Sequence, residues 1–240
     1  MQRHLEWEGV YNARDLGGLT TREGRLTRSH QLIRSDALDG LTATGWAAVW
    51  AYGVRTVIDL RDDPEIAPDA SPRPRGLTTI RLPLDGSADR EFWKAWKSGP
   101  QFGTPLYYQP HLDRMPERSA AVITAIADAP PGGVVFHCAG GRDRSGQIAM
   151  LVLALADVLP DEIADDYALS AQRLHARYES LGEANQDQVL SDFLAERGTT
   201  ARDIVLSILK DLDPARVILN AGASQDDISK LRGRLLGGIG

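Results

Sequence analysis

In the first part of the chain, short apolar runs typical of strands alternate with a segment whose apolar residues have helical spacing. Short apolar or β-branched runs at residues 55–60 and 78–84 predict buried strands. Residues 41–53 carry apolar side chains at helical spacing and end in a glycine, which is typical of a helix C-terminus. A polar, proline-rich stretch at residues 62–76 predicts a loop between the two strands.

The second part of the chain is dominated by helical patterns. A helix over residues 118–129 stops at Pro-Pro-Gly-Gly and is followed by a strand at residues 134–137. Residues 145–158 are apolar on nearly every side, so we expect a buried helix there. Amphipathic helices follow over residues 160–240. The alternation predicts an α/β fold with a mainly parallel central sheet flanked by helices and a helical C-terminal extension.

Residues 86–118 interrupt this regularity with a mixture of aromatic residues, lysines, glycine and proline. We expect this segment to be a partly helical lid or insertion over a site, within a single domain spanning residues 1–240. Its aromatic side chains suit a substrate-stacking lid and a small satellite core equally well. They are Phe92, Trp93, Trp96, Tyr107 and Tyr108.

Charge and composition exclude several classes of protein. A net charge of −6 argues against broad nucleic-acid binding, which needs a basic face. A single cysteine excludes an intramolecular disulfide, and no zinc-ligand spacing is present, so we expect neither a metal nor another cofactor. Without an apolar run long enough for a bilayer or a signal-peptide core, we expect a cytoplasmic protein by default, with leaderless export left open. The oligomeric state stays unknown at this level.

The one cysteine lies in the stretch HCAGGRDRSG, residues 137–146, between a predicted strand and a predicted helix. Successive N–H groups of such a loop can form an anion-binding concavity, and the helix adds its own N–H groups and dipole. Arg144 can bind two phosphate oxygens with its planar guanidinium. The candidate substrate-binding residues are therefore Ala139, Gly140, Gly141, Arg142, Ser145 and Gly146.

The same field acts on Cys138 itself. A thiol beside arginines and over a helix N-terminus is expected to favour the thiolate form, a nucleophile for phosphoryl transfer. Ser145 could donate a hydrogen bond to the sulfur, and His137 could orient it. The alternative is a buried structural cysteine beside a glycine turn, in which case the arginine six positions later would be a coincidence.

His137-Cys138 to Arg144-Ser145 resembles the HC(x)5R(S/T) signature of cysteine-dependent tyrosine phosphatases. The loop is most similar to that of bacterial atypical tyrosine and dual-specificity phosphatases, and further landmarks occur in family order at residues 12–18, 32–38, 53–61, 82–85 and 165–170. The resemblance implies a tyrosine-phosphatase-like fold and a cysteinyl-phosphate intermediate. It implies phosphotyrosine substrates and, for some members, phosphoserine, phosphothreonine or phosphoinositides. Arg142 replaces the usual lysine, and Gly140 stands where the family tends to have alanine.

Two aspartates are candidates for the proton donor that the leaving group needs. The resemblance points to Asp85, at the end of a predicted strand, and Asp143 lies within the loop itself. Asp62 and Asp63 are more typical of solvated loop carboxylates. For the segment with Asn12 and Arg14 we expect a supporting role beside the loop.

The sequence therefore predicts a metal-independent phosphatase in which Cys138, Arg144 and Asp85 or Asp143 are catalytic. Its partner would be a phosphorylated protein or a phosphoinositide. Alternatives are a non-catalytic module that binds phosphorylated ligands, or a phosphoinositide-specific phosphatase. An arsenate reductase is disfavoured because it normally needs further thiols, and a sulfurtransferase would leave the phosphate-binding arginine without a purpose.

Overall fold

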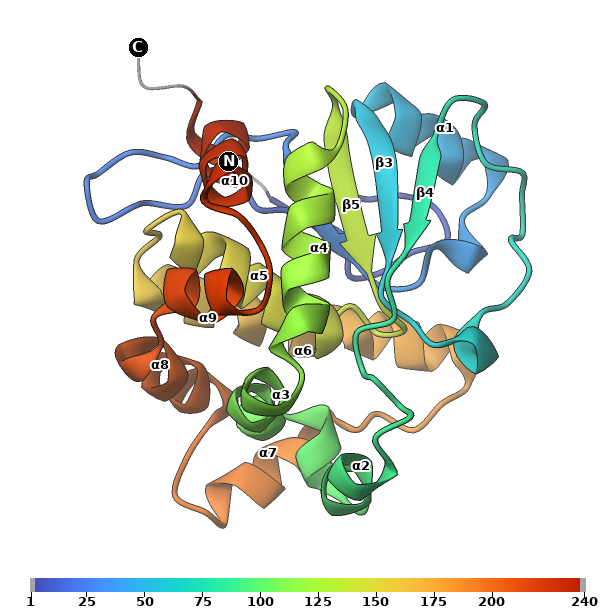
Figure 1. Cartoon of the computed structure of the whole chain (residues 1–240). Coiled ribbons are helices and arrows are strands. Elements are labelled where there is room, and N and C mark those ends of the chain that lie inside the picture. The colour runs from blue at the N-terminus through green and yellow to red at the C-terminus, as the bar shows by residue number, and fades with distance from the viewer. Residues whose placement is uncertain (1–2, 238–240) are drawn as a thin grey trace.

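A five-stranded, mainly parallel sheet forms the centre of the protein in the computed structural model, which describes residues 3–237 (Figure 1). The strand order is β1-β2-β5-β3-β4, and only the β1–β2 pair is antiparallel. The strands are β1 (Arg14–Asp15), β2 (Leu32–Ser35), β3 (Val54–Asp59), β4 (Thr78–Arg81) and β5 (Gly133–His137). The predicted α/β class is confirmed.

Ten helices of the described chain surround the sheet. They are α1 (Ala43–Ala51), α2 (Arg90–Trp96), α3 (Tyr108–Arg114), α4 (Pro116–Asp128), α5 (Arg144–Leu155), α6 (Pro160–Leu181), α7 (Asp187–Ala195), α8 (Ala201–Asp211), α9 (Pro214–Asn220) and α10 (Gln225–Leu236). Short 3-10 turns add η1 (Leu38–Gly40), η2 (Asp63–Glu65), η3 (Pro100–Gly103) and η4 (Pro105–Tyr107). Local chemistry sets several helix starts: the Thr42 hydroxyl accepts the N–H of Gly45 at α1, and Ser224 and Asp227 form a reciprocal cap at α10.

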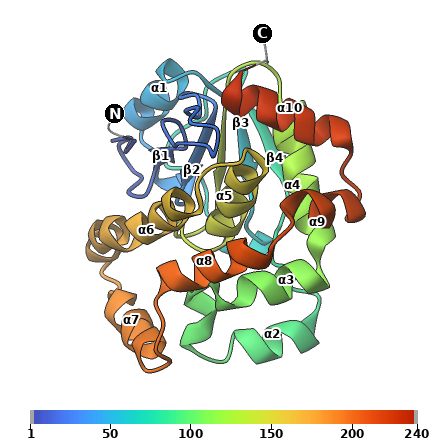
Figure 2. The same cartoon turned by 90° about the vertical axis from the view of Figure 1, so that its left-hand side faces the viewer.

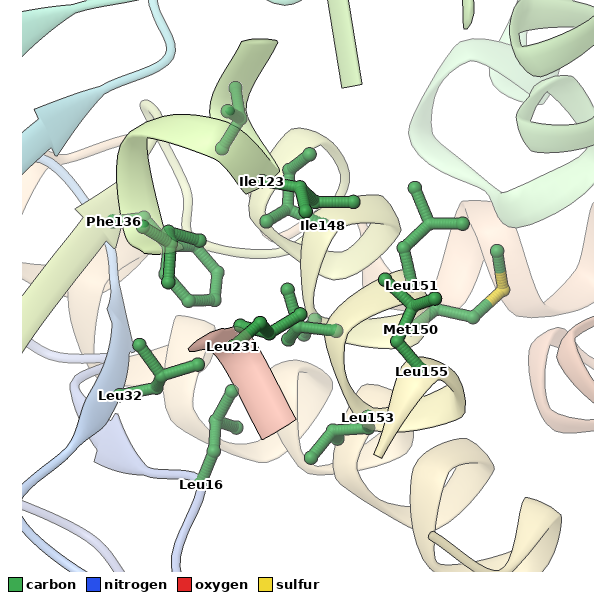
Figure 3. Close-up of a cluster of buried hydrophobic side chains, with 14 of the residues drawn as sticks. Leu16, Leu32, Ile123, Phe136, Ile148, Met150, Leu151, Leu153, Leu155 and Leu231 are labelled. Atoms are coloured by element: carbon green, nitrogen blue, oxygen red, sulfur yellow. The ribbon is translucent and has the colours of Figure 1, made fainter. Parts of the chain in front are cut away.

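Alternation along the central strands divides the core into two layers. In β5, Val134 and Phe136 face the cluster under α4 and α5, whereas Val135 faces the cluster under α1. Helix α5 lies in the larger cluster, and all of its residues except Ala154 are buried, as its apolar sequence predicts (Figure 3). The sheet is thus covered on both faces, which is the usual condition for parallel strands.

One predicted strand is longer than the strand observed. The strand expected over residues 78–84 ends at Arg81, because Pro83 lacks an N–H for the ladder. The chain nevertheless stays extended there: the N–H groups of Leu82 and Leu84 donate to the carbonyls of Asp59 and Leu60. Residues 82–85 therefore continue along the end of β3 and carry Asp85 to the same sheet edge.

β5 is the last strand in the sequence but the central one in the sheet. Its carboxyl end, like those of β3 and β4, points to the side of the molecule where α2, α3 and α7 lie (Figures 1 and 2). Loops at this edge of an open parallel sheet are where ligand sites assemble. The residue after β5 is Cys138, so the fold places the thiol at the centre of that edge.

The irregular segment 86–118 forms α2, η3, η4 and α3 on that side of the sheet. Its aromatic side chains pack mainly on one another: Trp93 contacts Phe92, Phe102 and Tyr107 edge-on. Trp93, Tyr107 and Tyr108 are buried and belong to the larger core cluster. These three rings therefore serve chiefly as core.

No helix within residues 3–237 is both long and apolar enough to span a membrane.

Candidate active site

The residues between β5 and α5 form a tight loop around the thiol. Cys138 is only 2% exposed, and its Sγ lies 3.7 Å from Oγ of Ser145, which is hydrogen-bonding distance for sulfur. Arg144 is the first residue of α5, so the N-terminus of that helix begins beside the loop. The predicted order of strand, loop and helix is observed, with the nucleophile candidate at its start.

The carbonyl groups of the loop are bound from outside. Four residues from other parts of the chain donate to them: Ala37 N to Ala139 O (3.0 Å), Asn12 Nδ2 to Gly140 O (2.9 Å), Arg34 Nη2 to Gly141 O (2.8 Å) and Arg142 O (2.9 Å), and Tyr108 Oη to Asp143 O (2.6 Å). In a trans peptide the N–H points away from the carbonyl of the same unit. Holding these carbonyls outward therefore aims the N–H groups of residues 140–144 toward the interior of the loop, where an anion would be bound.

Two glycines of the loop have no room for a side chain. Gly141 has a positive φ of +66°, and a Cβ there would lie 2.5 Å from the backbone nitrogen of Asp36. At Gly146 a Cβ would lie 2.5 Å from the hydroxyl of Tyr108. Gly140 differs, because the nearest atom to a Cβ at this position would be a Leu174 carbon at 3.7 Å, an ordinary contact. The alanine that the family tends to have at this position would therefore fit in place of Gly140.

Arg144 is bound by a residue that the sequence did not single out. Glu65, on η2, accepts from Nη1 and Nη2 of Arg144 at 2.5 and 2.6 Å. The Nε of Arg144 lies 3.8 Å from Oδ1 of Asp85. Glu65 therefore fixes the plane of the guanidinium, and the Nε edge faces Asp85.

Asp85 is buried at the edge of the site. The residue is 3% exposed, and its Oδ2 lies 3.6 Å from Nζ of Lys97. Burial raises the pKa of Asp85 above its ordinary value, against the opposing effects of Arg144 and Lys97; Asp62 and Glu65 raise it further. A carboxyl in this environment holds its proton to higher pH than a solvated aspartate does.

Asp143 is engaged differently. Its Oδ1 accepts from the Tyr167 hydroxyl at 3.3 Å, and its carboxylate lies 3.3 Å from Nε of Arg142. Arg142 also donates to Asp187 of α7 at 3.3 Å and is 8% exposed. Arg142, which stands where the family usually has a lysine, is therefore paired with two carboxylates.

His137 does not contact the sulfur directly. Its Nδ1 lies 3.4 Å from the Cys138 carbonyl oxygen, and its Nε2 lies 3.7 Å from Oδ2 of Asp59. Burial lowers the pKa of His137 to about 4 despite the nearby Asp59 carboxylate, so the ring is neutral at pH 7. Any orienting effect of His137 on the thiol acts through the backbone.

A buried carboxylate anchors the far side of the loop. Asp166 of α6 is 1% exposed and binds three arginines: Arg3 (2.7 Å), Arg14 (3.1 Å) and Arg34 (2.8 Å). Burial alone would raise the pKa of Asp166, but Arg14, Arg34 and Arg3 together lower it well below its usual range. Arg14 also donates to the side-chain oxygen of Asn12 at 2.6 Å. The supporting role expected for Asn12 and Arg14 matches these contacts.

The site opens as two adjoining cavities of about 420 and 520 Å³ that share Glu65, Phe102 and Arg144. The first is lined by six predicted site residues: Cys138, Ala139, Gly140, Arg142, Asp143 and Arg144. Asp85 lines the second. Gly141, Ser145 and Gly146 are not among the lining residues. Gly141 lies against Asp36 and Gly146 against Tyr108, whereas Oγ of Ser145 lies beside the Cys138 sulfur.

Glu65, Arg34 and Asp166 are the residues that the sequence analysis missed. Arg34 and Asp166 do lie in two of the landmark stretches, residues 32–38 and 165–170, but nothing local indicates that they touch each other. Glu65 lies in the proline-rich loop that separates β3 from β4 and carries no local signal.

The fold is an α/β fold of the tyrosine-phosphatase type, and comparison with known proteins gives the family. The model of the tyrosine phosphatase family matches residues 5–237, so the chain belongs to this family.

Three relatives illustrate the similarity. A tyrosine-protein phosphatase of Nostoc commune is 35% identical over 147 residues, which cover 60% of this chain and 50% of the relative. A Cupriavidus necator protein, provisionally named a tyrosine-protein phosphatase, is 30% identical over 71% of this chain and 64% of its own length. The triple specificity protein phosphatase PtpB of Mycobacterium tuberculosis is 28% identical over 97% of this chain and 99% of its own. The chain thus spans less than two thirds of the first two relatives.

The two adjacent glycines of the loop should respond oppositely to alanine. In Gly141→Ala the alanine would have to adopt a positive φ, and its Cβ would clash with the neighbouring backbone. We therefore expect the free energy of unfolding to fall by about 1–3 kcal/mol. Gly140→Ala should leave it unchanged or raise it by about 0.4–1 kcal/mol, because alanine fits and the unfolded chain loses freedom. Urea denaturation of both variants measures this, and an equal loss in the two would contradict the loop geometry described above.

Proposed function

We propose that the protein hydrolyses phosphate monoesters through a cysteinyl-phosphate intermediate. The Cys138 thiolate attacks phosphorus, forming an S–P bond as the P–O bond to the leaving group breaks. Water then attacks the phosphocysteine, the S–P bond breaks, and inorganic phosphate leaves with the thiolate restored. One observation carries this function: the thiol lies within a loop whose carbonyls are all held outward, beside a fixed arginine and a helix N-terminus.

Arg144 and the loop N–H groups would bind the non-bridging phosphate oxygens. A guanidinium has five N–H donors. Glu65 takes one at Nη1 and one at Nη2, which leaves the Nε edge for two phosphate oxygens. Glu65 thereby positions the arginine for the substrate. The donors are in place before substrate arrives, so no reorganisation is needed as charge develops in the transition state.

We assign the proton donor to Asp85. In the first step its carboxyl proton passes to the departing oxygen, and in the second its carboxylate takes a proton from the attacking water. The raised pKa that burial gives this carboxyl suits the role. Asp143, the other candidate, has its carboxylate directed to Tyr167 and Arg142, which suits a structural role in the loop.

The charges of the cleft favour a substrate with a single phosphate. Four cations line the two cavities, and each has an acidic partner: Lys97 with Asp85, Arg142 with Asp187, Arg144 with Glu65, and Arg177 with Glu183. A second phosphate on an inositol ring would find no free cation among them. Phe102 and Tyr178 also line the cavity, and their rings suit a phenyl group. We therefore propose phosphotyrosine in proteins as the main substrate.

Metal-free turnover is the first test. We expect the wild type to release phosphate from p-nitrophenyl phosphate in the presence of EDTA, and Cys138→Ser to lower kcat by about a thousandfold or more, because the nucleophile is lost. Vanadate binding, followed by calorimetry, serves as the control for an intact anion site. Vanadate binding without any turnover in the wild type would instead favour a module that only binds phosphorylated ligands.

The two acid candidates are separated by the leaving group. Asp85→Asn should lower kcat for a phosphotyrosine peptide by about 10²–10⁴-fold, and should affect p-nitrophenyl phosphate much less because its leaving group departs readily without a proton. In the wild type the rate falls as the pH rises through the pKa of Asp85, since the acid must be protonated, and this decline should disappear in Asp85→Asn. If Asp143→Asn shows this pattern and Asp85→Asn does not, the assignment is reversed.

The proposed substrate class can be tested by comparing two substrates and by weakening the ion pairing of Arg142. For the wild type, kcat/KM should be at least about tenfold higher for a phosphotyrosine peptide than for a soluble phosphatidylinositol bisphosphate. A tenfold difference corresponds to about 1.4 kcal/mol of differential binding. Asp187→Asn removes one of the two carboxylates that pair with Arg142, and it should raise kcat/KM for the bisphosphate by about two- to fivefold, with the peptide unchanged. A wild type that prefers the bisphosphate would point to a phosphoinositide phosphatase.

A further inference from the structure

Arg34 connects the loop to the buried centre of charge behind it. It lies on β2, next to β5, and is 1% exposed. One end of its guanidinium, Nη1, donates to Oδ2 of Asp166 at 2.8 Å. The other, Nη2, donates to the carbonyls of both Gly141 and Arg142, at 2.8 and 2.9 Å. No other side chain in the described chain donates to those two carbonyls.

We propose that Arg34 is a positioning residue that orients the anion-binding N–H groups of the loop, with Asp166 as its anchor. The proposal rests on the function proposed above and adds a residue outside the cleft to its machinery. Arg34 lines neither of the two cavities, so it acts on the substrate only through the backbone of the loop.

The physical reason lies in the peptide units that Arg34 binds. Each trans peptide places its N–H opposite its carbonyl, so fixing Gly141 O and Arg142 O outward directs the N–H groups of Arg142 and Asp143 inward. A positive φ at Gly141 and the small residues before it make this backbone intrinsically permissive. Without Arg34 the two units can rotate and turn a carbonyl dipole toward the phosphate and the thiolate. Both anions would then be less stable.

The anchor explains why the donor here is an arginine. A lysine has a single nitrogen and cannot reach Asp166 and two carbonyls at once, whereas the planar guanidinium spans them. Asp166 compensates the buried charge of Arg34, and its two other partners, Arg3 and Arg14, fill its remaining acceptor sites. Loss of any one arginine therefore disturbs the same ion cluster.

Arg3 provides a matched control. It binds the same carboxylate as Arg34, donating to Oδ1 of Asp166 at 2.7 Å, but its other hydrogen bond goes to the Asp15 carbonyl and it makes no contact with the loop. Arg3→Met and Arg34→Met thus each remove one cation from Asp166. Only the second also releases two loop carbonyls.

The test compares these two variants in the full chain by three measurements: vanadate affinity, KM for p-nitrophenyl phosphate, and the pH dependence of Cys138 alkylation by iodoacetamide. Both variants should unfold at lower urea concentration than the wild type. Only Arg34→Met should weaken vanadate binding and raise KM, by about ten- to a hundredfold, because hydrogen bonds to a charged group are misaligned. It should also shift thiol ionisation to higher pH.

Arg34→Lys separates charge from geometry and covers the case in which Arg34→Met does not fold. It should recover most of the stability while keeping weak vanadate binding and the shifted alkylation profile. The proposal is overturned if Arg34→Lys, or a folded Arg34→Met, matches Arg3→Met in vanadate affinity and alkylation. Wild-type protein that binds vanadate without turnover would refute the proposed function and still allow this comparison.

Discussion

The structure of the site depends on the direction of five carbonyl groups. Each one between Ala139 and Asp143 is bound by a donor from another part of the chain, and this alone leaves the N–H groups free to converge on an anion. The donors come from β2 and its following residues, the N-terminal segment and α3. The conformation of the loop therefore depends on residues along the whole sheet edge and not only on the ten residues of the loop.

Buried charge is the cost of this arrangement, and the fold compensates it in pairs. Arg14 and Arg34 are both almost fully buried, and two guanidinium groups so close together would repel each other strongly without Asp166 between them. Burial and the neighbouring Arg34 lower the pKa of Arg14 to about 10, which still leaves it charged at neutral pH. The same rule holds in the cleft, where Glu65 balances Arg144 and Asp187 balances Arg142. Pairing weakens the attraction of these cations for a polyanion, which is the basis of the substrate class proposed above.

Much of the fold follows from local patterns. The apolar α5 is buried because no face of it can meet water favourably, and β5 is central because both of its faces are apolar. The strand at residues 78–84 is shorter than its pattern indicates because one proline removes a donor. The aromatic residues of segment 86–118 could belong to a lid or to a core by their sequence, and only their mutual contacts assign Trp93, Tyr107 and Tyr108 to the core.

By itself the sequence determined the α/β class, the strand–loop–helix around Cys138, and the spacing that brings Arg144 back to the thiol, because periodicity and a short loop are local properties. The family resemblance marked Asp85, which follows a predicted strand, as one of two candidates for the proton donor. Tertiary structure alone decided which groups orient these residues. Glu65 is 79 positions from Arg144, Arg34 is 107 from Gly141, and Arg34 is 132 from Asp166. Contacts at such separations arise from strand order and helix packing, which no local pattern of residues specifies.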